Sequence, residues 1–351
     1  MTEIVDEPRQ PGMIDPDWDA FVESSPNGAY TQLSAWAAIK RANGWLAHRI
    51  RAGANGTLGA QVLVRRIGRS LWSVGYAPRG PIPAARYSEP GVAALTGRLR
   101  ELAREERLSH VIIDPEVEAG DVLADWLDGA GWRPAPPIQP DRSRLVDLSR
   151  PEEALWSDLR SKWRQYVQKA RRNGVTVVES GAEGLEDFYR IYVDTARRAG
   201  FLYRTADSYR RTFETFAADG RARLLFAALD GAPVATLVLV HCGRRVIEPY
   251  GGMLPAGADA RANYLLKWEA IRSSRERGFA IYDMWGLSHA GIEQFKTGFG
   301  GREVRYIGAW ELVANPPVRL AVGAAQRLRV ALARRRHGLD GRGAAAPADA
   351  G

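Results

Sequence analysis

Five polar residues have types and positions that suit the binding of a polar ligand. Asp114, Tyr250 and Asp283 each lie at the end of a strand-like run, and Lys296 lies in a short helical run that follows. Ligands of open sheets bind near such strand ends. A carboxylate there suits steering or deprotonation of an amine, and the guanidinium fork of Arg204 suits two-point binding of a phosphate. These residues therefore predict a polar ligand site.

The sequence contains no recognisable motif for covalent catalysis or for metal binding. The chain has no GxSxG elbow, no Walker loop and no HExxH pair. Cys242 is the single cysteine and lies in the apolar run TLVLVHC, so we expect it in the core. The five histidines are far apart in sequence. We therefore expect no metal and no other cofactor.

Length and composition indicate a globular protein with two domains. The chain has 351 residues, of which 45% are hydrophobic. No apolar run approaches the roughly 20 residues that span a bilayer, and the acidic N-terminal segment does not resemble a secretory signal. We expect a cytoplasmic protein. The net charge of +8 suits a polyanionic partner, either nucleic acid or an anionic lipid surface.

Each half of the chain is predicted to contain the same order of elements: helix, a meander of strands, a Gly/Pro-rich turn, then helix, strand, short helix and strand. In the first half these are a helix near 34–42, strands near 46–51, 59–66 and 70–76, a helix near 91–106, a strand at 111–114, a short helix near 121–129 and the strand RLVDLS. In the second half they are helices near 185–199 and 208–218, three strands within 223–250, a helix near 262–277, the strand AIYDM, a short helix near 292–297 and the strand YIGAWELV.

This order fits two GNAT-like acyltransferase domains in tandem, an α/β (α+β) fold with a mixed, mainly antiparallel sheet in each domain. We expect flexible ends at residues 1–15 and 338–351, a first domain at 16–150 and a second at 151–315. The Q/RxxGxG/A loop with which GNAT enzymes hold acetyl-CoA is missing, because the corresponding turn reads GGMLPAGADARANY. The fold therefore predicts acyl transfer from a different donor.

Six segments make the chain resemble the FemABX family, the aminoacyl-tRNA-dependent transferases that extend the peptide stem of peptidoglycan precursors. The segments are TQLSAWAAIK, VIIDPEVE, AGFLYRTADSYRR, PYGGM, YDMWGL and GIEQFKTGFGG. The resemblance extends over residues 21–313 and is densest in the last seventy. One departure is Trp285, which replaces a family glycine and is expected to narrow the pocket or change the accepted amino acid. The family's long helical hairpin is missing.

The resemblance implies roles for individual residues. Lys296 would stabilise the oxyanion as the ester carbonyl is attacked, with Asp114 as a base. The residues implied in substrate binding are Trp36, Lys40, Arg204, Tyr209, Tyr250, Asp283 and Trp285. Purely structural alternatives remain open at this point. Lys40 could be a solvated lysine beside a core tryptophan, Asp114 could cap a turn, and Arg204 could lie at the start of a surface helix. The resemblance also implies that a C-terminal helix at 316–337 packs on the first domain.

Two basic helices are candidate contacts for polyanions. Residues 151–173 form one predicted helix whose apolar face repeats every three or four residues. Its other face carries Arg160, Lys162, Arg164, Lys169, Arg171 and Arg172, either as a solvated surface or as a contact for tRNA phosphates. The arginine-rich helix 318–336, with an apolar stripe from Val318 to Leu332, is a candidate contact for an anionic membrane.

The sequence therefore predicts a non-ribosomal peptidyltransferase that moves an amino acid from aminoacyl-tRNA to a peptidoglycan precursor, either lipid II or UDP-MurNAc-pentapeptide. Such an enzyme needs no covalent intermediate, because the nucleophile is the substrate's own amine. Two alternatives remain: an N-acyltransferase that uses acyl-CoA or another carrier, and a non-catalytic scaffold that binds RNA or membrane.

Overall fold

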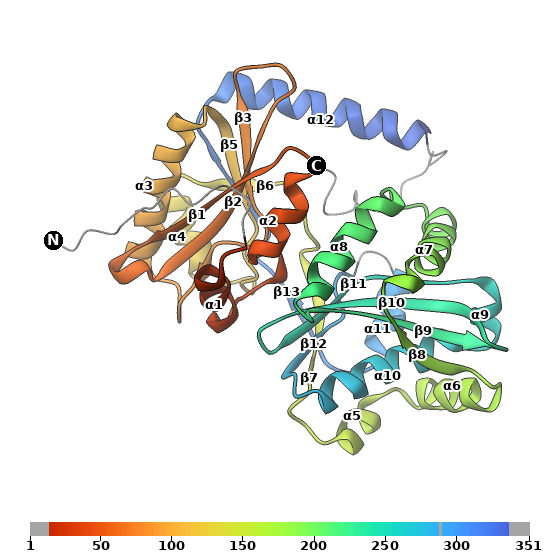
Figure 1. Ribbon diagram of the computed structural model, residues 1–351. Helices are drawn as coiled ribbons and strands as arrows, with labels where there is room; N and C mark the ends of the chain where they lie inside the picture. The colour runs from red at the N-terminus through yellow and green to blue at the C-terminus, as the bar shows by residue number, and fades with distance from the viewer. Residues whose placement is uncertain (1–13, 288–289, 337–351) are drawn as a thin grey trace. The chain divides into compact units, whose positions relative to one another are not determined.

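The computed structural model describes residues 14–287 and 290–336 and divides into two compact units (Figure 1). The first unit comprises the described residues up to Glu116 together with Val122–Ala135 and Ala309–Leu320. The second comprises Val117–Asp121, Pro136–Gly308 and the described residues from Ala321 onward. The expected flexible ends lie largely outside the described residues.

The first unit is built on a mixed sheet with the strand order β1-β2-β3-β5-β14-β6, with β4 added on β2. Its strands are β1 (Leu46–Ala52), β2 (Leu58–Arg66), β3 (Ser73–Ala77), β4 (Ile82–Pro83), β5 (Leu108–Ile113), β6 (Arg133–Ala135) and β14 (Ala309–Val313). Its helices are α1 (Pro16–Ser24), α2 (Ser34–Arg41), α3 (Glu89–Glu105) and α4 (Leu123–Gly129), with short 3₁₀ turns at Tyr30–Gln32 and Ala54–Gly56. Helix α3 packs on β5, β1 and β2.

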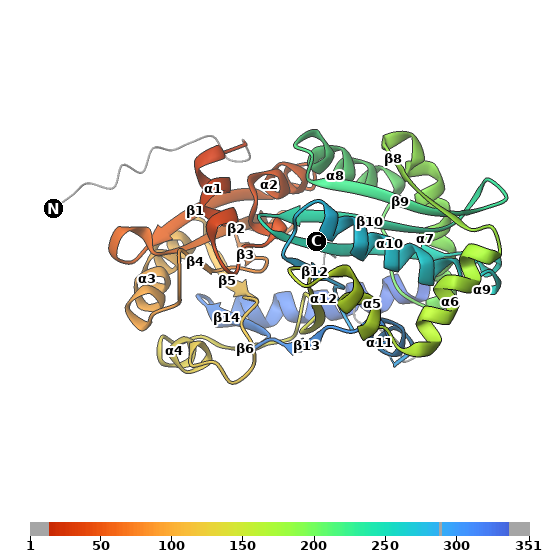
Figure 2. The ribbon, with the colours of Figure 1, turned by 90° about the horizontal axis from the view of Figure 1, so that it is seen from below.

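The second unit repeats this plan in the order β13-β7-β12-β11-β10-β9-β8. Its strands are β7 (Arg142–Asp147), β8 (Thr176–Ser180), β9 (Ala222–Leu229), β10 (Ala232–Cys242), β11 (Arg245–Met253), β12 (Ile281–Asp283) and β13 (Arg302–Arg305). Its helices are α5 (Glu152–Asp158), α6 (Ser161–Arg172), α7 (Leu185–Ala199), α8 (Ala206–Ala218), α9 (Pro255–Asp259), α10 (Ala262–Glu276) and α11 (Ala290–Thr297), with a 3₁₀ turn at Ala182–Gly184. Helix α10 packs on β9 and β10 and against α6 (Figure 2).

The two sheets confirm the predicted mixed and mainly antiparallel arrangement. Strands β3 and β5 pair in parallel in the first sheet, as β11 and β12 do in the second. The other pairs within both sheets are antiparallel. Cys242 is buried at the end of β10, as expected of a core residue.

The units exchange one strand each, which differs from the predicted division at residue 150. Strand β7, expected to close the first domain, lies between β12 and β13 in the second sheet. Strand β14, expected to close the second domain, lies between β5 and β6 in the first. Apolar alternation predicts that a segment is a strand but does not specify its partner, because pairing depends on contacts distant in sequence.

The predicted helix 151–173 is two helices, α5 and α6, separated at Leu159 and Arg160. Both residues have extended backbone angles, and the Arg160 amide donates to the Gly298 carbonyl at 2.9 Å. The apolar face was predicted correctly, because Leu159, Trp163, Val167 and Ala170 are all buried. Leu159 remains in the core across the break, so the spacing of apolar residues does not reveal it.

Helix α12 (Pro316–Arg336) does not follow the expected packing along its length. Its first turn belongs to the first unit, where Arg319 pairs with Glu311. Farther along, Val322 is buried, but Leu328 and Leu332 of the predicted stripe are 62% and 47% exposed. Among the residues that the structure describes, no helix is both long and apolar enough to cross a membrane.

Candidate active site

Lys296 lies at the centre of a polar cluster in the second unit. It is carried by α11, and its ammonium donates to the carbonyl oxygens of Met284, Trp285 and Gly286, the last at 2.9 Å. These three residues form the loop that leaves β12. An ammonium has three N–H donors, so Lys296 fastens this loop with all of them. Only 13% of its side-chain surface is exposed.

The loop after β12 has a backbone conformation that glycine adopts most easily. Trp285 has φ +48° and Gly286 has φ +69°. The left-handed region costs a residue with a side chain about 1 kcal/mol or more. Trp285 thus adopts a backbone conformation that favours glycine, and it is partly exposed.

Asp283 holds this loop through a hydrogen bond to its backbone. It is fully buried, and its carboxylate accepts hydrogen bonds from Ser143, from Arg245 and from the Trp285 amide, the last at 2.8 Å. Burial alone would raise the pKa of Asp283, but Arg245 and these hydrogen bonds hold it below its ordinary value. Both carboxylate oxygens accept hydrogen bonds from protein donors. A contact between Asp283 and substrate stays a prediction.

Two buried charged residues that the sequence analysis did not single out complete the cluster. Glu248 of β11 lies 3.8 Å from the Lys296 ammonium, forms an ion pair with Lys267 of α10 and accepts a 2.6 Å hydrogen bond from Tyr282. Lys267 is 2% exposed and Glu248 is 6% exposed. Their signal in the sequence is a single charge within an otherwise apolar run, in VIEPY and in LLKW.

The cluster moves the pKa of Lys296 toward neutrality. Burial lowers the pKa of Lys296 to about 8, a shift that Glu248 opposes and Lys267 reinforces. Burial also lowers the pKa of Lys267, while Glu248 acts in the opposite direction. At neutral pH Lys296 is therefore mainly protonated, and it is a preorganised cation in a site with little water.

Arg204, Tyr209 and Tyr250, which were predicted as substrate-binding residues, come together in a second cluster of the same unit. The Tyr209 and Tyr250 rings meet edge to face with centroids 5.2 Å apart, and Tyr192 of α7 contacts both. The Arg204 amide donates to the Tyr209 hydroxyl at 3.2 Å, and the Tyr189 hydroxyl donates to the Arg204 carbonyl at 3.2 Å.

Burial keeps these phenols protonated. It raises the pKa of Tyr209 to about 12 and raises the pKa of Tyr250, the latter against the opposing influence of Arg204. Neutral hydroxyls remain hydrogen-bond donors at neutral pH. Tyr192 belongs to this group but was missed, because it reads as one more apolar residue on the buried face of α7.

A bulge in β11 connects the two clusters. Val238 of β10 pairs with Tyr250, but Val240 pairs with Ile247, so β11 has one extra residue between them. Pro249 stands in this bulge and has no amide hydrogen for the ladder. The extra residue interrupts the alternation of side chains, and Glu248 contacts α10 while Tyr250 contacts α7 and α8.

The remaining predicted residues of the first unit are buried. Trp36 is fully buried and the Lys40 ammonium lies 4.6 Å from its ring centre, with Lys40 only 5% exposed, so Lys40 is not a solvated surface lysine. Asp114 accepts hydrogen bonds from the Tyr76 hydroxyl at 2.8 Å and from the Arg79 amide at 2.5 Å. These contacts match the turn-capping alternative.

Asp114 nevertheless has an unusual acidity. Burial raises the pKa of Asp114 to about 6, although Arg79 and the Tyr76 hydroxyl oppose the shift. A carboxyl group that titrates near neutral pH suits a general base. The role of Asp114 as a base therefore stays a prediction.

The basic residues predicted to contact tRNA are only partly available on α6 and at its start. Arg164 donates to the Ser157 carbonyl at 2.8 Å, and Arg171 pairs with Glu269 at 2.9 Å. Arg160, Lys162, Lys169 and Arg172 are exposed. Arg171 is exposed as well, and a contact with tRNA stays a prediction for all six.

Comparison with known proteins agrees with the geometry. Residues 14–125 match the model of the FemAB family, and residues 157–297 match an acetyltransferase (GNAT) domain. The chain is 30% identical to a lipid II:glycine glycyltransferase of Staphylococcus epidermidis over 86% of its own length and 91% of the relative's. A lipid II:glycine glycyltransferase of Staphylococcus aureus is also 30% identical, over 60% of this chain and 53% of the relative.

Among solved structures, FemX has a TM-score of 0.80 at 22% identity, and the alignment covers 87% of this chain and 97% of FemX. Two tandem sheets of GNAT type, with a buried lysine beside the loop after β12, define an acyltransferase. The 30% identity to the Staphylococcus epidermidis enzyme, over 86% of this chain, narrows the acyltransferase class to one family. The chain belongs to the FemAB family, and it is an aminoacyltransferase that forms peptide bonds.

Proposed function

We propose that the protein transfers an amino acid from aminoacyl-tRNA to an amine on the peptide stem of a peptidoglycan precursor, in the cytoplasm or at the inner face of the membrane. The curated relatives are glycyltransferases that act on lipid II. The observation that carries the proposal is the buried Lys296, held at one loop by three carbonyl groups and flanked by Glu248.

The proposed reaction needs no covalent enzyme intermediate. The substrate amine attacks the ester carbonyl carbon and forms the new C–N bond. The ester C–O bond then breaks, and the ribose hydroxyl of the tRNA leaves with a proton that originates from the amine. The positive charge of Lys296 would stabilise the oxyanion between these steps, which is worth on the order of 3 kcal/mol.

The tyrosine cluster and the first unit would serve substrate binding. Arg204 would bind the diphosphate of the precursor, and Tyr209 and Tyr250 would line the approach of the amine with neutral hydroxyls. Trp36 and Lys40 are further proposed contacts for the anionic part of the precursor. The exposed residues of α6, with Arg160 at its start, would contact tRNA phosphates without reading sequence.

A reconstituted transfer assay tests this function. Purified protein is incubated with a mixed pool of charged tRNAs and with lipid II or UDP-MurNAc-pentapeptide, and the product is weighed by mass spectrometry. We expect one amino acid to be added and the rate to fall by about 100-fold in Lys296→Ala. Arg190→Ala, which removes an exposed ion pair with Asp187 on α7, is the matched control and should keep full activity.

Three outcomes would contradict the proposal. Transfer from acyl-CoA without charged tRNA would favour the N-acyltransferase alternative. Full activity in Lys296→Ala would remove the role of this cation. The third outcome is that neither precursor receives an amino acid, which would leave no acceptor of the proposed class.

A further inference from the structure

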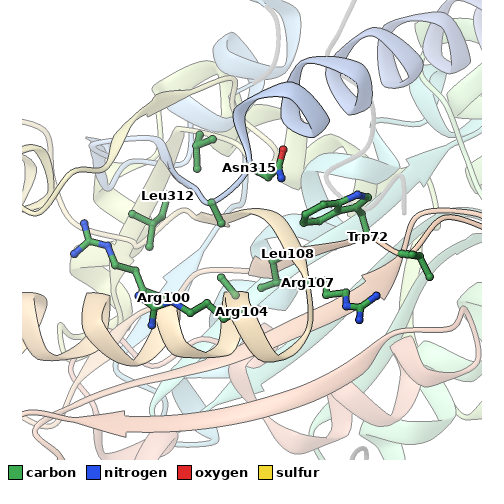
Figure 3. Close-up of a pocket in the computed structure, with 11 residues that line it drawn as sticks. Trp72, Arg100, Arg104, Arg107, Leu108, Leu312 and Asn315 are labelled. Atoms are coloured by element: carbon green, nitrogen blue, oxygen red, sulfur yellow. The ribbon is translucent and has the colours of Figure 1, made fainter.

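A basic pocket in the first unit is lined by none of the residues proposed for catalysis or substrate binding. It has a volume of about 640 Å³ (Figure 3). The residues that line it are Leu71, Trp72, Arg100, Ala103, Arg104, Arg107, Leu108, Leu312, Val313, Ala314 and Asn315. The lining therefore contains three arginines and no acidic residue, so the pocket favours an anion.

The three arginines stand together on one wall of the pocket. Arg100 and Arg104 are one turn apart on α3, and Arg107 follows the end of that helix. Figure 3 shows them opposite Leu312 and Asn315, with Trp72 at one end. The Arg100 guanidinium donates to the Ala130 carbonyl at 2.8 Å, which fixes its position.

Two nearby carboxylates, of Glu101 on α3 and of Glu106 just after it, have other partners. Glu101 pairs with Arg98 at 2.7 Å, and Glu106 contacts His48 at 3.5 Å. Within the described part of the chain, no ion pair of Arg104 or Arg107 is recorded. The positive charge of the pocket is therefore available to a ligand.

Two exposed leucines lie in the same unit as the arginines, and one of them lines the pocket. Leu71, in the β2–β3 hairpin, lines the pocket and is 63% exposed. Leu320 of α12, five residues after Asn315, is 73% exposed. On α12, Leu320, Leu328 and Leu332 fall within about 120° of one another around the helix axis, on the side away from the buried Val322. Arginines beside protruding apolar side chains are typical of a surface that binds anionic lipid.

We propose that this pocket binds the phosphate of an anionic phospholipid headgroup, while Leu71 and Leu320 enter the boundary between headgroups and acyl chains. The two leucines favour lipid over RNA, because phosphate contacts alone would not require exposed apolar side chains. Trp72 fits the same location, since tryptophan is enriched at the membrane interface. This surface would hold the enzyme at the bilayer independently of its acceptor substrate.

Vesicle binding tests the proposal without any precursor or tRNA. Full-length protein is sedimented with phosphatidylcholine vesicles that contain or lack phosphatidylglycerol. We expect binding only when phosphatidylglycerol is present. Arg104→Gln/Arg107→Gln should weaken it about 30-fold, because each basic residue near an anionic surface contributes about 1 kcal/mol. Arg210→Gln/Arg211→Gln on α8 removes the same charge from exposed ion pairs and should bind as the wild type does.

A second pair of variants separates lipid from RNA. Leu71→Ser/Leu320→Ser leaves the net charge unchanged and should still weaken vesicle binding several-fold, with no effect on the binding of uncharged tRNA. The proposal is overturned if the wild type ignores phosphatidylglycerol, if the pocket and control arginine variants lose binding equally, or if the leucine variant binds vesicles as well as the wild type. Because the assay contains no acyl donor, failure of the transfer reaction would not affect its result.

Discussion

Lys296 combines a structural and an electrostatic role in one side chain. Its ammonium holds the carbonyls of Met284, Trp285 and Gly286, and its charge is only partly balanced by Glu248 at 3.8 Å. Since burial lowers its pKa to about 8, the residue changes charge within an accessible pH range. The proposed role of its charge can therefore be tested by titration.

We expect the transfer rate at saturating substrates to fall as pH rises through about 8, because Lys296 loses the proton that stabilises the oxyanion. Because the pKa of Lys296 is lowered, Lys296 loses its positive charge at a lower pH than an ordinary lysine does. The rate should therefore fall as the pH rises. In Lys296→Arg the charge persists, so the alkaline decline should disappear even if the rate is lower throughout. A decline of the same shape in both proteins would assign it to another group.

The ion pair between Glu248 and Lys267 ties β11 to α10 and sets the environment of Lys296. Both partners are almost completely buried. Removal of one partner of a buried pair leaves an uncompensated charge, which is far more costly than the loss of an exposed pair.

Lys267→Met should therefore lower the free energy of unfolding by about 3 kcal/mol, and Glu248→Gln/Lys267→Met should lose less than this single change. Arg98→Met, which breaks an exposed pair with Glu101 on α3, should cost less than about 1 kcal/mol. Denaturant unfolding measures all three. If the double variant is less stable than Lys267→Met, then Glu248 has a stabilising role beyond this ion pair.

The elements were predictable where a repeating pattern marks them. The apolar spacing of α6 predicted this helix and its buried face, and the apolar runs of β9 to β11 predicted these strands. Pro249 within a strand-like run is a local signal for the bulge. The break at Leu159 depends on a partner distant in sequence, the Gly298 carbonyl, and no local pattern reveals it. The same limit applies to Glu248 and Lys267, whose proximity requires β11 and α10 to pack first.

At the scale of the whole molecule, strand β14 makes the first unit depend on both ends of the chain. Strand β14 pairs with β5 on one side and β6 on the other, so the first sheet is incomplete until residues 309–313 are present. Strand β7 has the same position between β12 and β13. A sequence boundary near residue 150 separates neither unit, because the sheets are closed by segments from the other half of the chain.

A chain that ends after Gly308 should therefore leave β5 with an open edge, whereas a chain that ends after Leu320 should keep the first sheet intact. Hydrogen exchange of the amides in Leu108–Ile113 measures this difference. In the shorter chain we expect protection of β5 to fall and aggregation to increase, because an unpaired edge strand exposes its hydrogen-bonding groups. In the longer chain, β14 still pairs with His110–Ile113 and protection should match the full-length protein. Equal protection of β5 in the two truncated chains would mean that β14 is dispensable for the first unit.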